Sequence, residues 1–277
     1  MCRWIAYSGG PVYLEELLFK PKHSLIDQSL AARAGETTTN GDGFGVGWYG
    51  TGAEPGLYKG VQPAWSDENL IDLASQIKSP LFMAHVRSTT GTAVQRTNCH
   101  PFRHGRWLFQ HNGAICDFQR VKRELMLAVS PSLFPQITGS TDSEVMFFLA
   151  LTFGLEEDPI AGVERMVGFV EDVGRKNDIA NPLQMTVAIL DGQTLYAFRY
   201  SSEGRSRTLF HSASIETLRR YFPNVDVFSD HARAVVSEPL GAIELAGKIW
   251  VEVPESSAVI VAAGAVDIVP LRPHLPV

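Results

Sequence analysis

A short apolar run in the first third of the chain, from Leu81 to Val86, constrains the fold most strongly. His85 is the polar residue that interrupts it. A strand with one face in water alternates apolar and polar side chains, whereas a strand covered on both faces is apolar almost throughout. The run therefore predicts a strand that is buried on both faces of its sheet.

The residues around this run predict further strands together with amphipathic helices. The predicted helices cover residues 14–19, 68–78, 118–129, 145–153 and 159–176. The other predicted strands cover residues 3–8, 106–111, 184–190, 194–200, 208–211, 232–237, 249–253 and 258–263. Helices that flank so many strands predict stacked sheets covered by layers of helices.

Glycines alternate with large apolar residues from Asn40 to Tyr49. Gly45 and Gly47 suit a strand that packs closely beneath another backbone, because glycine has no Cβ. A phosphate-binding loop is the functional alternative. The spacing matches neither nucleotide-binding fingerprint and no helix signal follows, so we expect a strand here.

The composition is that of a folded protein. Of the 277 residues, 45% are hydrophobic and 19% are charged, which supplies a large core and argues against extended disorder. No internal repeat and no Ser-rich or Pro-rich linker divides the chain. We expect a single domain over residues 2–277, in which residues 266–277 form a tail punctuated by prolines.

Charge and hydropathy argue against two classes of partner. The formal net charge is −6 and the basic residues are scattered, so we expect no binding to nucleic acid. No apolar run approaches the roughly 18 residues that a membrane helix needs. The three cysteines, Cys2, Cys99 and Cys116, lack disulfide-like and metal-like spacing. We therefore expect a cytoplasmic protein, with Cys99 and Cys116 as small buried residues.

Cys2 has the chemistry of a nucleophile if Met1 is removed. It then bears a thiol, with a reference pKa of about 8.5, and an α-amine, with a reference pKa of about 7.7 to 8.0. The amine can relay the thiol proton near neutral pH, so that one residue supplies both nucleophile and base. The alternative is that the residue after the initiator methionine has no special role.

Further segments place polar residues or glycine at the end of a predicted strand or the start of a predicted helix, where local folding does not require them. They are residues 84–91 with 98–102, residues 111–113 and residues 141–144. Together with Cys2 they specify a site for an amino acid amide. Arg87 offers a forked donor for an α-carboxylate, and Asp142 offers an acceptor for an α-ammonium. The Asn112 side chain and the Gly113 backbone N–H can hold a tetrahedral oxyanion.

Structural roles remain open for the same residues. Arg87 could be a partner in a buried ion pair, and Asp142 could be an acid that stabilises the positive end of a helix. A zinc site is the alternative for the nearby histidines together with Cys99. Their spacing matches no ordinary zinc site and a metal would compete for the thiolate, so we expect no metal and no cofactor. These histidines are His85, His100, His104 and His111.

The order and spacing of these motifs resemble class II glutamine amidotransferase domains. The motifs are Cys2, His85-Val86-Arg87, Asn98-Cys99-His100-Pro101-Phe102, His111-Asn112-Gly113 and Thr141-Asp142-Ser143-Glu144. Met1-Cys2-Arg3-Trp4, residues 40–49 and Ser237-Glu238-Pro239-Leu240 resemble the stand-alone branch of that family. This branch includes the ergothioneine-pathway amidohydrolase and the glutathione-degrading amidotransferase subunit. The resemblance covers about residues 2 to 265.

The resemblance implies an α+β fold of the N-terminal-nucleophile hydrolase type, a four-layer αββα sandwich with two mainly antiparallel sheets between helices. It also implies Cys2 as the nucleophile with its α-amine as the base. Thr90 matches a position near the substrate carboxylate, and His100 matches one that supports the pocket. Larger members of the family have Trp and His where this chain has Ser88 and Gly91, so we expect a different pocket wall and a different gate.

The implied reaction is attack of Cys2 on the γ-carboxamide of glutamine or of a γ-glutamyl compound, followed by hydrolysis of a γ-glutamyl thioester. Either glutamine supplies ammonia to a separate synthase, or a larger γ-glutamyl compound is cleaved, alone or with a peptidase subunit. The alternative is a non-catalytic or partner-dependent glutamine-binding or regulatory subunit, because a retained Met1 would block the α-amine. The sequence leaves the oligomeric state open, and a homodimer is one arrangement.

Overall fold

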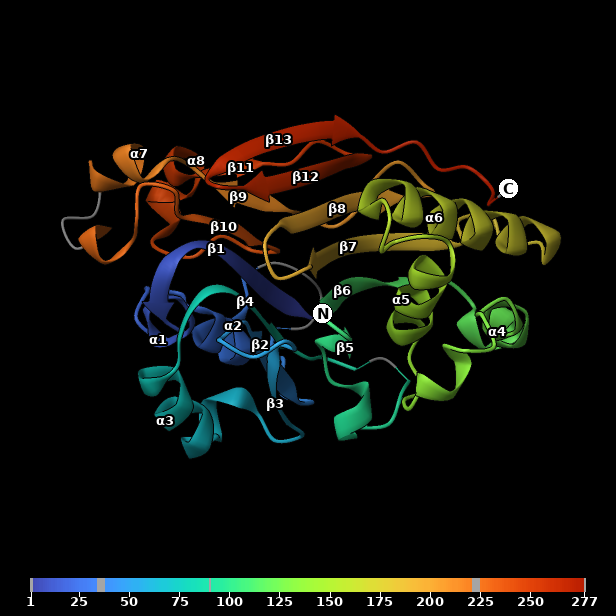
Figure 1. Cartoon of the computed structure of the whole chain (residues 1–277), viewed down its shortest axis with the longest axis horizontal. Coiled ribbons are helices and arrows are strands. Elements are labelled where there is room, and N and C mark those ends of the chain that lie inside the picture. The colour runs from blue at the N-terminus through green and yellow to red at the C-terminus, as the bar shows by residue number, and fades with distance from the viewer. Residues whose placement is uncertain (1, 34–37, 90, 221–224, 277) are drawn as a thin grey trace.

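A computed structural model describes residues 2–33, 38–89, 91–220 and 225–276 of the chain. Its strands form two antiparallel sheets whose inner faces share one apolar layer. Helices cover the outer face of each sheet (Figure 1). The layers therefore follow the order helices, sheet, sheet, helices, and the predicted α+β sandwich is confirmed.

In the described ranges, the first sheet has seven strands. They are β1 (Arg3–Tyr13), β2 (Phe44–Trp48), β3 (Gly56–Gly60), β4 (Lys78–Val86), β9 (Phe210–Ser212), β10 (Arg233–Val236) and β11 (Trp250–Glu252). In space they follow the order β11-β9-β10-β1-β4-β2-β3. The chain thus begins in a strand that has neighbours on both edges.

The second sheet has six strands within the part of the chain that the structure describes. They are β5 (Phe102–His104), β6 (Trp107–Ile115), β7 (Leu183–Leu190), β8 (Leu195–Ser201), β12 (Ser257–Ala262) and β13 (Ala265–Pro270). Their order in space is β13-β12-β8-β7-β6-β5, so the last strand of the chain lies at one edge and β5 at the other.

The helices divide between the two outer faces, as Figure 1 shows. The first sheet is covered by α1 (Glu15–Leu18), α2 (Leu25–Ala31) and α3 (Glu68–Gln76), and the second by α4 (Phe118–Leu127), α5 (Asp142–Thr152) and α6 (Pro159–Lys176). The short helices α7 (Ile215–Arg219) and α8 (Ala246–Ile249) lie near β9 and β11. None of the helices in the described ranges has the length and apolar character needed to cross a membrane.

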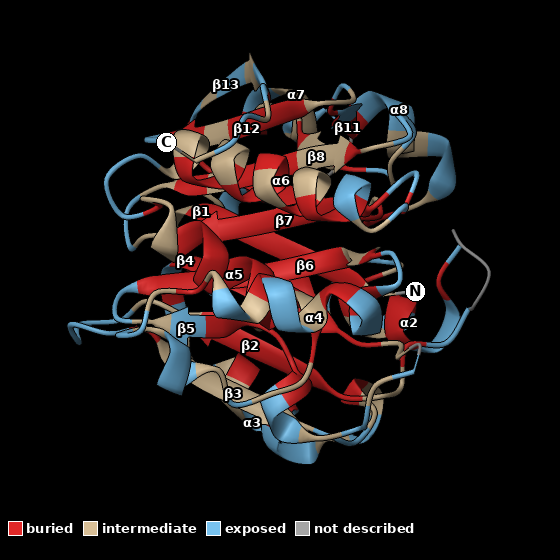
Figure 2. Ribbon diagram, turned by 90° about the vertical axis from the view of Figure 1, so that its right-hand side faces the viewer, coloured by how far each residue is buried: buried red, intermediate tan, exposed pale blue. Residues whose placement is uncertain are grey.

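The side chains of β1 alternate between two apolar layers. Ile5 and Tyr7 pack with the helices that cover the first sheet, whereas Trp4 and Ala6 point into the layer between the sheets. In the neighbouring strand β4, every residue from Leu81 to Val86 is buried, and Figure 2 shows that most of β6 and β7 is buried. The strand predicted to be buried on both faces is confirmed.

Two local predictions in the first sheet are wrong. The first strand does not end at Ser8 but continues through Gly9, Gly10 and Pro11 to Tyr13, with a register shift against β4. The helix predicted over residues 68–78 is too long, because α3 ends at Gln76 and Lys78 is already the first residue of β4. Pro80 falls at the shift in register, where a proline costs no ladder hydrogen bond.

Two predictions for exposed residues are also corrected. Residues 266–277 do not begin as a tail, because Ala265–Pro270 forms β13 and pairs with β12. The residues after it run along α6, where the His274 N–H donates to the Glu164 carbonyl at 3.4 Å. Cys116 is exposed rather than buried, while Cys99 is buried as predicted.

Gly45 lies beneath the segment that carries His100, as predicted for a glycine at this position. A Cβ on residue 45 would overlap the His100 carbonyl oxygen. The strand β2 therefore allows a second backbone to approach only because this residue lacks a side chain.

Replacing Gly45 by Ala should lower the free energy of unfolding by about 1–3 kcal/mol, because the added methyl group overpacks a buried contact. Urea denaturation measures the change. Gly50→Ala is the matched control, since a Cβ there meets no atom of the described residues within 4 Å. Equal stability of the two variants would contradict the close approach.

Candidate active site

Cys2 lies immediately before β1. The antiparallel register of β1 and β4 pairs Arg3 with Val86, so Cys2 comes next to the chain that leaves β4 at Arg87. The Cys2 Sγ is 3.5 Å from both the backbone nitrogen and the carbonyl oxygen of Ser88. Burial raises the pKa of the Cys2 thiol, and the Ser88 N–H and the positive charge of Arg87 oppose this rise.

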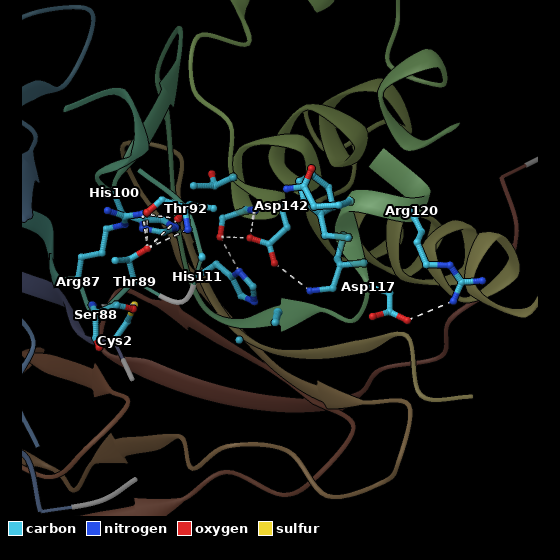
Figure 3. Close-up of a pocket in the computed structure, with 18 residues that line it drawn as sticks. Cys2, Arg87, Ser88, Thr89, Thr92, His100, His111, Asp117, Arg120 and Asp142 are labelled. Atoms are coloured by element: carbon cyan, nitrogen blue, oxygen red, sulfur yellow. Dashed lines mark hydrogen bonds and ion pairs between the residues drawn. The ribbon is translucent and has the colours of Figure 1, made fainter. Parts of the chain in front are cut away.

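A pocket of about 400 Å³ opens beside the Cys2 thiol (Figure 3). Cys2 and Arg87 lie at one end in this view, Asp142 lies in the middle, and Asp117 and Arg120 lie at the other end. The lining residues are Cys2, Arg87, Ser88, Thr89, Gly91, Thr92, His100, His111, Gly113, Ala114, Ile115, Asp117, Phe118, Gln119, Arg120, Thr141, Asp142 and Ser143.

The loop after β4 fixes the Arg87 guanidinium. Its Nη1 donates to the backbone carbonyl oxygens of Asp42 and Ala93, both at 3.3 Å. Its Nη2 donates to Thr89 Oγ1 at 3.2 Å and to Thr92 Oγ1 at 2.6 Å. Among the described residues no carboxylate forms an ion pair with Arg87, so the geometry does not support the alternative of a buried ion pair.

The strand β6 has one open edge at the pocket. β5 pairs with it only over Trp107–Phe109, whereas β7 pairs with its other edge as far as Ile115. The Ile115 N–H points out of the open edge and donates to Asp142 Oδ2 at 2.9 Å. Since N–H groups two residues apart on a strand point to the same side, the Gly113 N–H also faces the pocket.

Asn112 lies on the face of β6 that points toward the first sheet. Leu108, four residues earlier on the same face, packs in the apolar layer between the sheets. Asn112 is 5% exposed and stands beside the pocket, outside its lining. A Cβ on the next residue, Gly113, would overlap the Gln184 carbonyl oxygen, so this position requires glycine.

Three buried histidines, His85, His100 and His111, surround the site. The His85 Nε2 donates to the His111 carbonyl at 3.2 Å, and the His111 Nδ1 lies 2.8 Å from Ser143 Oγ. Burial lowers the pKa of all three imidazoles, that of His85 to about 3. The rings are therefore neutral at pH 7. In the described ranges, no group of three or more His, Cys, Asp and Glu side chains could hold a metal ion.

Arg3 connects Cys2 with Glu238, which lies 235 positions after Arg3 in the chain. Its Nη1 donates to the Cys2 carbonyl at 2.8 Å, and its Nε donates to Glu238 Oε2 at 2.7 Å. Glu238 also accepts from the Arg33 backbone N–H at 2.9 Å and from the His23 ring. Burial alone would raise the pKa of Glu238, but His23, the Arg33 N–H and Arg3 outweigh it and lower this pKa to about 2.

The structure brings together most of the residues that the sequence predicts for the site. The predicted residues in the pocket lining are Cys2, Arg87, His100, Gly113 and Asp142. Asn112 adjoins the pocket, and Thr90 lies outside the described residues. Asp142 is also the first residue of α5, so it lies both at a helix start and in the pocket lining.

Sequence reasoning missed the side chains that hold these groups in place. Thr89 and Thr92 orient Arg87, and the run of hydroxyl residues that follows the arginine was a usable signal for them. Glu238 orients Arg3 across 235 residues of chain, and no local pattern marks such a contact.

The family model for class II glutamine amidotransferases matches residues 21–273. The chain belongs to this family. The probable glutamine amidotransferase DUG3 of Saccharomyces cerevisiae is 34% identical in an alignment of 227 residues that covers 72% of this chain and 64% of the yeast protein. The match thus spans less than two thirds of that relative. The gamma-glutamyl-hercynylcysteine sulfoxide hydrolase of Mycolicibacterium smegmatis is 29% identical over 199 residues, 70% of this chain and 81% of the hydrolase.

Two solved structures share the fold of this chain. A glutamine aminotransferase class-II domain protein from Silicibacter pomeroyi has a TM-score of 0.72 and 31% identity, covering 98% of this chain and 100% of that protein. The glutamine phosphoribosylpyrophosphate amidotransferase of B. subtilis has a TM-score of 0.63 and 16% identity, covering 99% of this chain and 50% of that one. At this identity the second likeness concerns the fold alone.

In this class II amidotransferase, Glu238→Gln should destabilise the fold most at neutral pH. The folded-state pKa of about 2 lies below the ordinary value for Glu, about 4.3, so the carboxylate stabilises the fold fully above the ordinary value. This contribution is lost as the pH falls from about 4.3 toward 2. The difference in unfolding free energy between wild type and variant should therefore shrink, as urea denaturation at about pH 7 and about pH 3 would measure.

Glu203→Gln, at an exposed turn, is the control and should show no such pH dependence. A difference for Glu238→Gln that stays constant over this range would show that the Glu238 charge does not stabilise the fold.

Proposed function

We propose that this chain is a γ-glutamyl amidohydrolase with Cys2 as its nucleophile. The observation that carries the proposal is one pocket lined by the Cys2 thiol, the Arg87 loop, the Gly113 edge of β6 and Asp142. Acyl transfer needs a nucleophile, an oxyanion hole and groups that orient the substrate, and these residues offer all three. Residues 2–277 would act as one amidotransferase domain, with β13 as part of its second sheet.

The proposed reaction requires removal of Met1, which frees the Cys2 α-amine. Because burial raises the pKa of the thiol, a base beside the sulfur is needed at neutral pH, and the amine serves as that base. The sulfur attacks the γ-carboxamide carbon, and the Asn112 side chain and the Gly113 N–H stabilise the oxyanion. The C–N bond then breaks, the amine returns its proton to the departing nitrogen, and water hydrolyses the γ-glutamyl thioester to glutamate and free thiol.

Arg87 and Asp142 would hold the α-carboxylate and the α-ammonium of the γ-glutamyl group. Asp142 Oδ2 accepts from the Ile115 N–H, and Oδ1 accepts from the Ser143 N–H at 2.8 Å. Oδ1 also accepts from the Ser143 hydroxyl at 3.3 Å, which uses its second lone pair, whereas Oδ2 keeps one lone pair for a substrate ammonium. We assign Thr90 to the carboxylate end of this subsite, and His100, which lines the pocket, to its support.

The site suits a leaving group larger than ammonia. Ser88 lines the pocket beside the Cys2 sulfur, where larger members of the family have Trp, and the smaller side chain leaves more room next to the scissile bond. One similar protein is named for hydrolysis of a γ-glutamyl compound and another as a probable glutamine amidotransferase. We therefore propose a γ-glutamyl amide as the substrate, with glutamine as the smaller alternative.

The proposed chemistry also bears on partners and compartment. Use of released ammonia in a synthesis would require a separate synthase, and complete degradation of a larger γ-glutamyl compound would require a peptidase. A thiol nucleophile must stay reduced, so we propose that the protein acts in the cytoplasm.

Cys2→Ala should abolish hydrolysis of glutamine and of γ-glutamyl peptides, because no other group of the site replaces the nucleophile. It should also abolish covalent labelling by a diazo-ketone glutamine analogue. The exposed thiol of Cys116 offers a control, since Cys116→Ala should keep both activity and labelling. The intact mass of the protein from its own host should lack Met1. A label at another residue, or activity in Cys2→Ala, would overturn the assignment.

Asn112→Ala should lower kcat by about a hundredfold or more, because loss of one oxyanion donor costs roughly 2.7 to 4 kcal/mol. Steady-state kinetics on a γ-glutamyl peptide measure the change, and KM should move little. Asn181→Ala, at an exposed position, is the control and should match wild type. A normal kcat in Asn112→Ala would remove this residue from the oxyanion hole.

A further inference from the structure

Hydrogen bonds cross the apolar layer between the sheets next to the pocket. Three of them are Gln110 Nε2 to the Ile5 carbonyl at 3.0 Å, His85 Nε2 to the His111 carbonyl at 3.2 Å, and Trp4 Nε1 to Thr186 Oγ1 at 3.2 Å. Apolar packing has no direction, whereas a hydrogen bond fixes both a distance and an angle. These bonds can therefore set how one sheet is placed against the other.

The hydrogen bond between Trp4 and Thr186 connects the first sheet with the strand of the proposed oxyanion hole, because the Thr186 hydroxyl also contacts Asn112. Thr186 lies in β7, is fully buried, and is paired with Asn112 across the β6–β7 ladder. Its hydroxyl accepts the Trp4 indole N–H and donates to the Asn112 carbonyl oxygen at 3.4 Å. One hydroxyl thus joins the strand that begins after Cys2 to the strand that carries the oxyanion donors.

The geometry of the peptide bond gives this contact its significance. The Asn112 carbonyl and the Gly113 N–H belong to one planar trans peptide unit, so they point in opposite directions. The carbonyl is turned toward β7 and Thr186, and the N–H is turned toward the open edge of β6 at the pocket. A hydrogen bond to the carbonyl therefore orients the N–H and, by polarising the amide, strengthens it as a donor.

The residue type at position 186 supports a specific role. Ala188 and Leu190 occupy the same face of β7 and pack in the apolar layer. Valine has nearly the shape of threonine and would bury no hydroxyl in that layer. Burying a threonine hydroxyl costs free energy unless the hydroxyl forms hydrogen bonds. Here it both accepts one, from Trp4, and donates one, to the Asn112 carbonyl.

We propose that Thr186 is a positioning residue that sets the Cys2 thiol at its working distance from the Asn112–Gly113 peptide. The proposal rests on the proposed function, in which Cys2 attacks and this peptide holds the oxyanion. Thr186 does not line the pocket and is expected to act only through the two strands that it joins.

Thr186→Val should lower kcat by at least about tenfold and leave KM within about twofold, because a shift of about 1 Å at the reacting atoms can cost a hundredfold in rate. Thr186→Ser keeps the hydroxyl and should restore most of the activity. Steady-state kinetics on a γ-glutamyl peptide supply both numbers. Val and Ser variants that lose kcat equally would overturn the proposal, because the effect would then follow from the methyl group.

Alkylation of Cys2 by iodoacetamide separates positioning from thiol chemistry. This reaction needs the thiolate but no oxyanion hole, so its rate in Thr186→Val should stay within about twofold of wild type. A fall that parallels the fall in kcat would show that Thr186 acts on the thiol itself, and would overturn the positioning role.

Two further variants serve as controls. Ser79→Ala also removes a buried hydroxyl, but one whose contacts, with the carbonyl oxygens of Tyr49 and Leu81, stay outside the second sheet. It should lower stability without changing kcat. Trp4→Phe removes the other partner of the contact, so the double variant with Thr186→Val should be no slower than the slower single variant. Multiplicative losses would contradict a shared contact.

The outcomes distinguish this proposal from the proposed function. If Thr186→Val keeps the kcat of wild type while Cys2→Ala is inactive, the positioning role of Thr186 is disproved and the proposed function stands. If Cys2→Ala remains active, the proposed function falls, and the role of Thr186 falls with it.

Discussion

The apolar layer between the two sheets is the interaction on which the site depends, because the two halves of the site belong to different sheets. Cys2 precedes β1 of the first sheet, and the Asn112–Gly113 peptide belongs to β6 of the second. Packed sheets keep their distance through interlocking side chains, but such packing fixes orientation only weakly. Gln110 donates a hydrogen bond across this layer and Thr186 accepts one. These bonds fix the relative orientation of the sheets that apolar packing leaves open.

Sequence patterns predicted the elements whose ends carry local signals. The bounds of α6 agree with the prediction because Asp158 caps the helix and Pro159 occupies its first position. The strand β1 was predicted too short, because the sequence Gly9-Gly10-Pro11 is typical of a strand end. In the structure a register shift lets the strand continue, with Pro11 exposed to solvent. The edge strand β13 was missed because Ala265–Pro270 is largely exposed and pairs on one side only.

The site was predictable to the extent that its residues interrupt regular patterns. Arg87 follows a buried strand and Asp142 lies at a helix start, positions at which the local fold does not require these charged residues. Both line the pocket. Thr186 gives no such signal, because a threonine within an apolar strand is unremarkable. Its partners, Trp4 and Asn112, lie 182 and 74 residues away, so only the fold shows the connection.

The Arg3–Glu238 pair has a consequence for biosynthesis. A ribosome makes Cys2 at the outset and Glu238 only when most of the chain has emerged, yet this carboxylate fixes the guanidinium that holds the Cys2 carbonyl. A nascent or prematurely terminated chain therefore has the Cys2 thiol but lacks the Glu238 carboxylate that positions Arg3. Bringing such distant residues together costs conformational entropy before their contact can form. The proposed nucleophile would thus be held in place only after residue 238 has been translated and β1 has paired with its neighbours in the first sheet.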